Sequence, residues 1–234
     1  MPDGAAGSGE IHVADWDGDA HPDIWVIDTA ADPVSIRVHP YASEYREVET
    51  ITTGVASGVA MSFGAADYDR DGLPDLYVVR HQATTRLEIW SGASGFTDRV
   101  LNVTTQLSGT ADAAKWRFSL ADHDVDGTPD LVAIRVDGDV TLRVLDGAAG
   151  YDGAPLFLTT GVPANNGGHY DMGDFDGDGR PDVLSLMSGG TLRVHLGGNQ
   201  GTSETFWFQP ADWACEASGS FVPWDFDGDR YGDL

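Results

Sequence analysis

Aspartate residues recur in this sequence with a spacing that suits the binding of a metal ion. Four Asp side chains fall at positions 1, 3, 5 and 9 of a nine-residue pattern, and an aliphatic residue follows each copy. The five copies begin at Asp15, Asp67, Asp122, Asp174 and Asp225. Carboxylates a few ångströms apart repel each other by roughly 1 kcal/mol per pair or more, and a divalent cation removes that repulsion. The pattern therefore predicts five metal-binding loops.

Oxygen atoms are the ligands that these loops offer, which favours Ca²⁺. Mg²⁺ requires a tighter octahedron and retains its waters, and Zn²⁺ prefers nitrogen and sulfur. We expect one Ca²⁺ per loop, about five ions in the chain, each bound by the four Asp side chains and the backbone carbonyl of position 7. The predicted carboxylate ligands are Asp15, Asp17, Asp19, Asp23, Asp67, Asp69, Asp71, Asp75, Asp122, Asp124, Asp126, Asp130, Asp174, Asp176, Asp178, Asp182, Asp225, Asp227, Asp229 and Asp233. The predicted carbonyl ligands are His21, Leu73, Thr128, Arg180 and Tyr231.

Other loop positions repeat as well. An EF-hand is excluded because its position 12 requires Glu, and Val, Val, Ala and Ser stand there in the first four copies. Glycine at position 6 in three copies predicts a positive φ, whereas Ala20 and Arg230 at that position predict strain. Position 2 always carries a planar ring, which we interpret as packing between neighbouring sheets. The His21 ring is expected to be incidental, because the carbonyl of this residue is the predicted ligand.

Short strands are the elements that must position these loops. In the second repeat, strand-like runs cover Met61–Ala66, Leu76–Arg80, Arg86–Trp90 and, more weakly, Arg99–Val103. The second run of the third repeat covers Leu131–Val136, and the weak fourth run of the first repeat covers Tyr45–Ile51. Alternation of apolar and polar residues over such lengths is typical of half-buried strands, and no amphipathic helix is evident. Four antiparallel strands in about 50 residues cannot bury both faces of a sheet alone. The sequence therefore predicts an all-β chain, a β-propeller of four-stranded antiparallel blades, with an open β-solenoid as the alternative.

The spacing of the loops sets the expected domain organisation. Successive copies begin 52, 55, 52 and 51 residues apart. We expect residues 1–234 to form a single β-propeller region, with repeats at approximately 9–59, 60–114, 115–166 and 167–218 and a partial repeat at 219–234. Four complete blades and the start of a fifth indicate a fragment of a larger propeller, of about six to eight blades. Its missing blades would then be partners of this chain.

These loops resemble the calcium loops of FG-GAP repeats, also called VCBS-type repeats, which form the blades of the integrin α-subunit propeller. The resemblance covers essentially the whole chain, and Phe63-Gly64-Ala65 echoes the Phe-Gly signature. In that family the loop joins the first and second strands of a blade, as the placement of the loops here predicts. The resemblance implies a calcium-binding, integrin-like propeller with a role in adhesion or binding.

Composition narrows the classes of function. The formal net charge is −25, which disfavours nucleic acids and anionic membrane surfaces. The single Cys excludes an intrachain disulfide, and no apolar run is long enough to insert into a membrane. The N-terminus does not have the pattern of a signal peptide, which we attribute to the chain being a fragment. Because such loops suit high calcium concentrations, we expect an extracellular, periplasmic or cell-surface location.

The expected function is a non-catalytic, calcium-stabilised module that binds a protein or a glycan. The alternatives are a propeller domain of a polysaccharide lyase or hydrolase, an accessory domain beside a separate catalytic domain, and an architectural spacer. Lyase chemistry needs a basic residue near an acidic sugar, and Lys115 is the only lysine. No catalytic residue is assigned, and Trp25, Trp90, Trp116 and Trp207 are expected to be packing residues.

Overall fold

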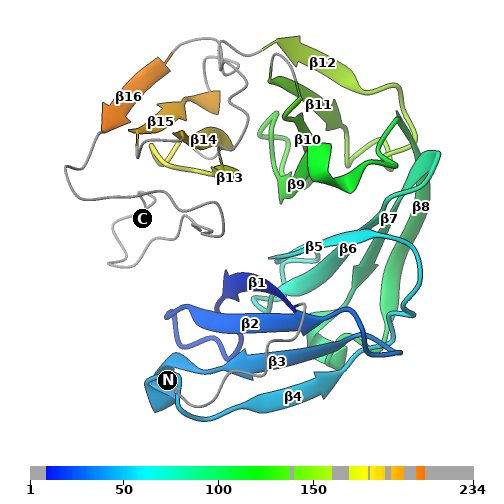
Figure 1. The fold of residues 1–234 in the computed structure, drawn as a ribbon, viewed down its shortest axis with the longest axis vertical. Coiled ribbons are helices and arrows are strands. Elements are labelled where there is room, and N and C mark those ends of the chain that lie inside the picture. Colours follow the sequence, from blue (N-terminus) through cyan, green and yellow to red (C-terminus); the bar gives the residue numbers. More distant parts are fainter. Residues whose placement is uncertain are drawn as a thin grey trace. The chain divides into compact units, whose positions relative to one another are not determined.

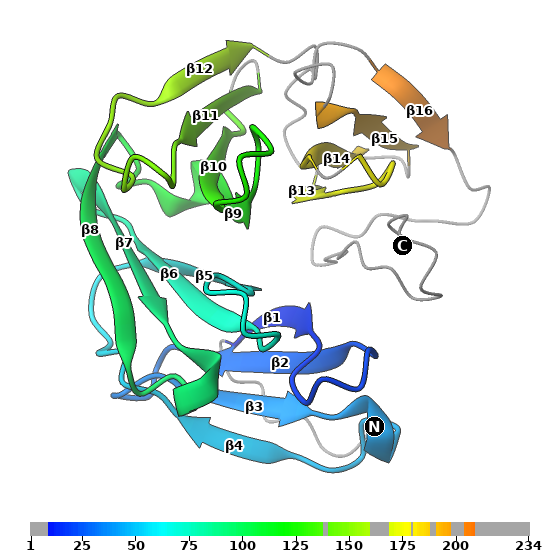
Figure 2. The same cartoon turned by 180° about the vertical axis from the view of Figure 1, so that it is seen from behind.

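β-strands form nearly all of the regular structure. The computed structural model describes residues 9–137, 140–159, 169–178, 180–187, 191–197 and 204–208. Four sheets of four strands follow one another along the chain, in the orders β1-β2-β3-β4, β5-β6-β7-β8, β9-β10-β11-β12 and β13-β14-β15-β16 (Figure 1). Figure 2 shows the same strands from behind. The predicted all-β class, with propeller blades of four antiparallel strands, is confirmed.

The strands are short, and three single-turn 3₁₀ helices lie between strands within the described residues. The first two sheets comprise β1 (Gly9–Ala14), β2 (Asp23–Asp28), β3 (Ser35–His39), β4 (Glu49–Thr52), β5 (Met61–Ala66), β6 (Asp75–Arg80), β7 (Thr84–Trp90) and β8 (Arg99–Ser108). The last two comprise β9 (Trp116–Ala121), β10 (Asp130–Arg135), β11 (Thr141–Leu145), β12 (Leu156–Thr159), β13 (His169–Gly173), β14 (Asp182–Met187), β15 (Thr191–His195) and β16 (Glu204–Phe208). The 3₁₀ helices are η1 (Tyr41–Ser43), η2 (Gly92–Ser94) and η3 (Ala113–Lys115).

Each of the four described Asp loops joins the first and second strands of its sheet. The register pairs Ala14 with Asp23 and Ala121 with Asp130, so each loop is closed by the last pair of the antiparallel ladder. Position 9 of the loop is therefore also the first residue of the second strand. This strand lies between two neighbours in every sheet, which explains why it is rich in buried aliphatic residues.

The chain forms two compact units, and the division between them passes through the second sheet. The first unit contains residues 1–59, 63–78 and 87–102, and the second contains residues 60–62, 79–86 and 103–234. In the first unit, the Trp25 ring is fully buried and its centroid lies 5.4 Å from that of Phe96, in the turn after β7. The Trp16 ring of the first loop also packs on Phe96, at 5.4 Å. This contact confirms the packing predicted for the position-2 ring of the first loop.

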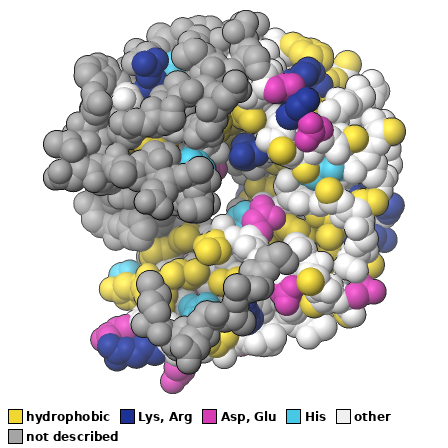
Figure 3. All heavy atoms as spheres, in the orientation of Figure 1, with side chains coloured by type: hydrophobic (Ala, Val, Ile, Leu, Met, Phe, Trp, Pro, Cys, Tyr) yellow, Lys and Arg dark blue, Asp and Glu magenta, His cyan; other side chains and the backbone are white. Residues whose placement is uncertain are grey.

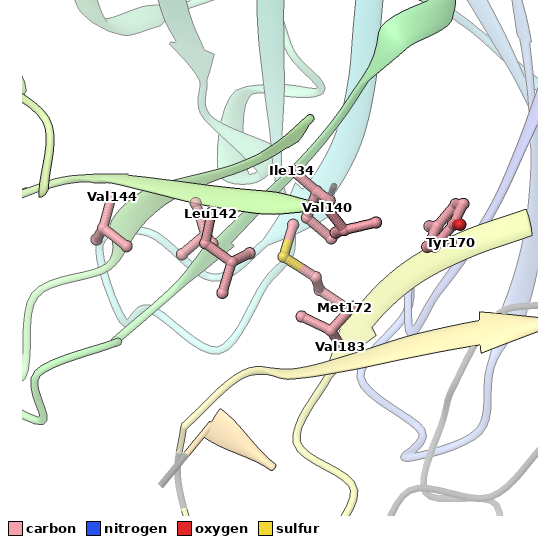
Figure 4. Packing of buried hydrophobic residues seen from close by; sticks show 8 residues of the cluster. Ile134, Val140, Leu142, Val144, Tyr170, Met172 and Val183 are labelled. Carbon is pink, nitrogen blue, oxygen red and sulfur yellow. The ribbon is translucent and has the colours of Figure 1, made fainter. Parts of the chain in front are cut away.

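In the second unit, the third and fourth sheets share a hydrophobic core. Ile134, Val140, Leu142 and Val144 from the third sheet are buried with Tyr170, Met172 and Val183 from the fourth (Figure 4). The contributing residues of β11 alternate with more exposed polar ones, as the period-2 pattern of a half-buried strand requires. Burial of these apolar faces against each other supplies the stabilisation that a single four-stranded sheet does not have.

The described surface carries opposite charges side by side. Figure 3 shows basic side chains next to acidic ones at several points of the visible face. Lys115 lies 3.2 Å from Asp112 and 3.4 Å from Asp137, and Arg46 lies 2.5 Å from Glu44. Exposed pairs of this kind contribute little to stability. Within the part of the chain that the structure describes, no helix has the length and apolar character needed to cross a membrane.

Candidate metal centres

Four groups of carboxylates lie at the ends of the four sheets. Each group contains three Asp side chains, with one oxygen from each lying within 4.8 Å of the others. The groups are Asp15, Asp17 and Asp19; Asp67, Asp69 and Asp71; Asp122, Asp124 and Asp130; and Asp174, Asp176 and Asp182. Three converging carboxylate oxygens suit a hard divalent cation such as Ca²⁺. The residues present therefore fit the predicted ion.

Backbone N–H groups hold these side chains inside the loops. In the third loop, Asp122 accepts hydrogen bonds from the N–H groups of Asp126, at 3.1 Å, and Gly127, at 2.8 Å. The Asp124 carboxylate also accepts from the Asp126 N–H, at 3.1 Å, and Asp126 accepts from the N–H of Thr128, at 2.7 Å. The other described loops repeat this arrangement with small variations. These backbone donors orient the carboxylates towards one another.

The position-9 aspartate has a second role that the sequence analysis did not identify. Asp130 is 2% exposed, and its two oxygens accept hydrogen bonds from His123 N–H, at 3.0 Å, and Gly147 N–H, at 2.8 Å. Gly147 belongs to the turn that follows the third strand of the same sheet. We call this arrangement the carboxylate bridge: a buried position-9 Asp that joins the loop to that turn. Its members in the other sheets are Asp23 with Trp16 and Tyr41, Asp75 with Tyr68 and Gly92, and Asp182 with Phe175 and Gly197.

Burial of the bridging carboxyl groups disfavours their ionised form. Desolvation raises the pKa of Asp23, Asp75 and Asp130, and it raises the pKa of Asp182 to about 6. The two backbone N–H donors of each bridge oppose this rise, whereas neighbouring loop carboxylates add to it. A bound cation would favour the ionised form of the same groups. The raised pKa values of these carboxyl groups are therefore compatible with a site that binds a cation.

Replacement of Asp130 by Asn is expected to destabilise the protein by about 1.5–3 kcal/mol even in the presence of a chelator. The amide has one acceptor oxygen, so one buried backbone N–H loses its partner. Asp126→Asn is the matched control, because Asp126 is exposed and the Asn oxygen can still accept from Thr128. Urea unfolding in chelator measures both variants, and equal free energies of unfolding would contradict the bridge.

Positions 4 and 6 of the first three loops adopt the left-handed backbone conformation. At position 6, Gly72 and Gly127 have φ of 88° and 92°, which confirms the prediction for these glycines, and Ala20 has φ of 67°. Position 4 behaves in the same way, with φ of 64° at Arg70 and 61° at Val125. A β-branched residue is strongly disfavoured in this region. The loop geometry therefore overrides the conformational preference of Val125. Gly179, at position 6 of the fourth loop, lies outside the described residues.

Val125→Gly is expected to raise the free energy of unfolding by about 1 kcal/mol. Glycine relieves the left-handed strain of roughly 1–2 kcal/mol, partly offset by its entropy in the unfolded chain. The lost burial is small because Val125 is 54% exposed. Val100→Gly, at a 47% exposed residue of β8, is the control and should destabilise the protein instead. Denaturant unfolding of the two variants tests the sign of each effect.

The predicted ligands of the Asp loops differ in how far the structure tests them. In each described loop it brings three of the predicted Asp side chains together. The position-7 carbonyl ligands stay predictions, and the fifth loop, from Asp225 to Asp233, lies outside the described residues. Trp25, Trp90 and Trp116 are buried, as expected of packing residues. The packing of the Trp207 side chain stays a prediction, because its burial lies outside what the structure describes.

One polar pair was not anticipated from the sequence. The Ser62 hydroxyl lies 2.8 Å from Nε2 of His81, whose Nδ1 lies 2.8 Å from the carbonyl oxygen of Thr110. His81 is 5% exposed, and its own backbone N–H donates to the carbonyl of Ala60. We interpret this pair as a structural connection between the start of β5 and the segment after β8. Sequence spacing gave no signal for it, because the three groups come from distant positions.

The repeated sheets and their acidic loops define a propeller protein built from loop-containing blades. The model of the FG-GAP-like repeat matches this chain four times, at residues 15–78, 67–133, 122–185 and 174–234. The chain belongs to the FG-GAP-like repeat family. These matches begin at the first Asp of each of the four described loops.

Comparison with solved structures gives a fold relative, whereas no curated protein sequence matches the chain. The relative is a structure described as the basis of specific recognition of non-reducing terminal N-acetylglucosamine by an Agrocybe aegerita lectin. The TM-score is 0.52 at 15% sequence identity, and the alignment covers 97% of this chain and 74% of the lectin chain. At this identity the likeness concerns the fold.

Proposed function

We propose that this chain is a calcium-stabilised propeller module that binds a glycan or protein ligand at a cell surface or in a secreted protein. The observation that carries the proposal is the recurrence of three converging carboxylates at the same connection in four sheets. Calcium would bind to these carboxylates and stiffen the connections between strands. The module would then present its surface loops as a rigid, preorganised platform, which reduces the entropy lost on binding.

A glycan is the ligand that we favour. The chain shares its fold with a lectin that is described as recognising N-acetylglucosamine, although the low identity transfers no binding site. The strongly negative net charge argues against polyanionic ligands, and neutral glycans are compatible with it. An extracellular setting is consistent with Asp-only loops, because weaker calcium sites are filled at the millimolar concentrations found there.

A binding screen in the presence and absence of calcium tests this function. The protein is applied to a glycan array and to a panel of extracellular proteins in about 1 mM calcium, the upper end of the dissociation constants of extracellular calcium modules, and again in chelator. We expect retention of neutral glycans in calcium and weaker retention in chelator, because loop order depends on the ion. Absence of binding to either class of ligand in calcium would contradict the proposal.

A further inference from the structure

The first repeat departs from the other described repeats at one position of the carboxylate bridge. The N–H that reaches the buried Asp belongs to Gly92, Gly147 and Gly197 in the second, third and fourth sheets. In the first sheet it belongs to Tyr41, which donates to Asp23 at 2.7 Å. The backbone contact is the same in all four sheets. The bridge therefore uses the backbone of Tyr41 and has no need of its side chain.

The aromatic ring of Tyr41 is not used to fill the core. Tyr41 is 43% exposed, and burying a large aromatic residue is normally its main contribution to stability. Tyr45, four residues further on, provides a contrast within the same turn. Its hydroxyl donates to the carbonyl of Pro22, at 3.2 Å, just as the Tyr151 hydroxyl donates to that of Pro129 in the third sheet. Tyr45 thus has a repeated structural role, whereas Tyr41 adds exposed aromatic surface.

The exposed ring has a defined orientation beside the first Asp loop. The His21 ring stacks on Tyr41, with centroids 4.2 Å apart and planes inclined by 27°. Tyr45 contacts Tyr41 edge-to-face, with ring centroids 5.9 Å apart and planes inclined by 77°. The His21 backbone N–H donates to Asp19 at 2.8 Å, so one exposed carboxylate lies next to the main chain that carries the His21 ring. All of these residues lie in the first unit, and Tyr41 and Tyr45 belong to the turn between β3 and β4 (Figure 1).

We propose that the stacked His21–Tyr41 pair is a platform for a neutral sugar ring, an inference that rests on the glycan-binding function proposed above. The face of a pyranose carries C–H groups that pack on an aromatic ring, while its hydroxyls require hydrogen-bond acceptors at the edge. The stacked rings supply the first surface. The loop carboxylates each offer one oxygen to the metal group, so their second oxygens supply acceptors. Negative charge in this loop disfavours uronic and sialic acids. The neutral monosaccharide is therefore the class of ligand that the chemistry selects.

The test uses the whole chain in millimolar calcium. Methyl glycosides of N-acetylglucosamine, glucose, galactose and mannose are titrated by ligand-observed NMR, with methyl glucuronide as the anionic comparator. Tyr41→Gly restores the residue type of the other repeats and retains the backbone N–H, so folding should be preserved. Tyr41→Phe retains the ring. Phe157→Ala removes a 63% exposed ring from another sheet and is the matched control.

The expected result is binding of at least one neutral glycoside that weakens about tenfold or more in Tyr41→Gly, which corresponds to the roughly 1.4 kcal/mol of an aromatic contact. Tyr41→Phe and Phe157→Ala should bind within about twofold of the wild type, and the glucuronide should not bind. Equal affinity of wild type and Tyr41→Gly would overturn the platform and leave the glycan-binding function standing. Absence of binding to these glycosides and to every glycan of the array would overturn both the platform and the glycan ligand favoured above. Binding of a protein ligand through Tyr41 would overturn the assignment of a sugar.

Discussion

Transfer of the protein from millimolar calcium into chelator is expected to lower its melting temperature by at least about 10 °C. A site at one hundred times its Kd stabilises the folded state by about 2.7 kcal/mol. For a chain of this size, each kcal/mol corresponds to roughly 2–4 °C, so the occupation of two loops is already sufficient. The structural reason is the convergence of three carboxylates in each described loop, which repel one another without a cation.

Calorimetry with calcium and magnesium, together with thermal melting, checks this expectation. Calcium should bind in several equivalents and raise the melting temperature, whereas the same concentration of magnesium should have a smaller effect. Asp124→Asn removes an exposed carboxylate from the third group and should lower the calcium stoichiometry by about one. A melting temperature that does not respond to calcium would refute the metal centres.

Gly147→Ala is expected to reduce the free energy of unfolding by about 3 kcal/mol or more, the largest effect that we anticipate from a single methyl group. A Cβ at this residue would lie well inside van der Waals distance of the Pro129 carbonyl oxygen. The turn would have to move away, and the hydrogen bond from Gly147 N–H to the buried Asp130 carboxylate would be lost. Overpacking of about 1–3 kcal/mol thus adds to the loss of a buried hydrogen bond.

Gly153→Ala is the control for this substitution. No heavy atom lies within 4 Å of a Cβ built on Gly153, so alanine is expected to change stability by less than about 0.5 kcal/mol. Urea unfolding in calcium provides the comparison, with circular dichroism to verify that both variants retain the β fold. If Gly147→Ala were as stable as the wild type, the close approach of Gly147 to the Pro129 carbonyl oxygen would be contradicted.

The parts of the fold set by local alternation and turn chemistry could be predicted from the sequence. The second strand of the third sheet was expected at 131–136 and lies at Asp130–Arg135, because its aliphatic run has a clear pattern. The fourth strand of the first sheet was expected at 45–51 and lies at Glu49–Thr52. Tyr41–Ser43 form a 3₁₀ turn, and Glu44 and Tyr45 adopt positive φ, so that segment is not extended. Side-chain polarity carries no information about such a turn.

The sequence predicted which aspartates form the candidate metal centres, but it did not predict the hydrogen bonds that hold them in place. Spacing identified the aspartates, but it assigned Asp23 and its counterparts a single role as ligands. Their hydrogen bonds go to backbone N–H groups 7 and 15–18 residues away, and residue type leaves no trace of such partners. The left-handed conformation of Arg70 and Val125 was equally hidden, because both residues disfavour it and the loop imposes it.

The carboxylate bridge also bears on how a chain of this kind can grow during evolution. Every bridge joins residues of one repeat, and the Asp loop that it closes belongs to the same repeat. A tandem duplication of about 50 residues would therefore copy the loop, its buried anchor and the glycine turn in one event. The new copy would need to adapt only its apolar faces to its neighbours. Descendants could then vary individual turns, as Tyr41 varies the first, without disturbing the remaining repeats.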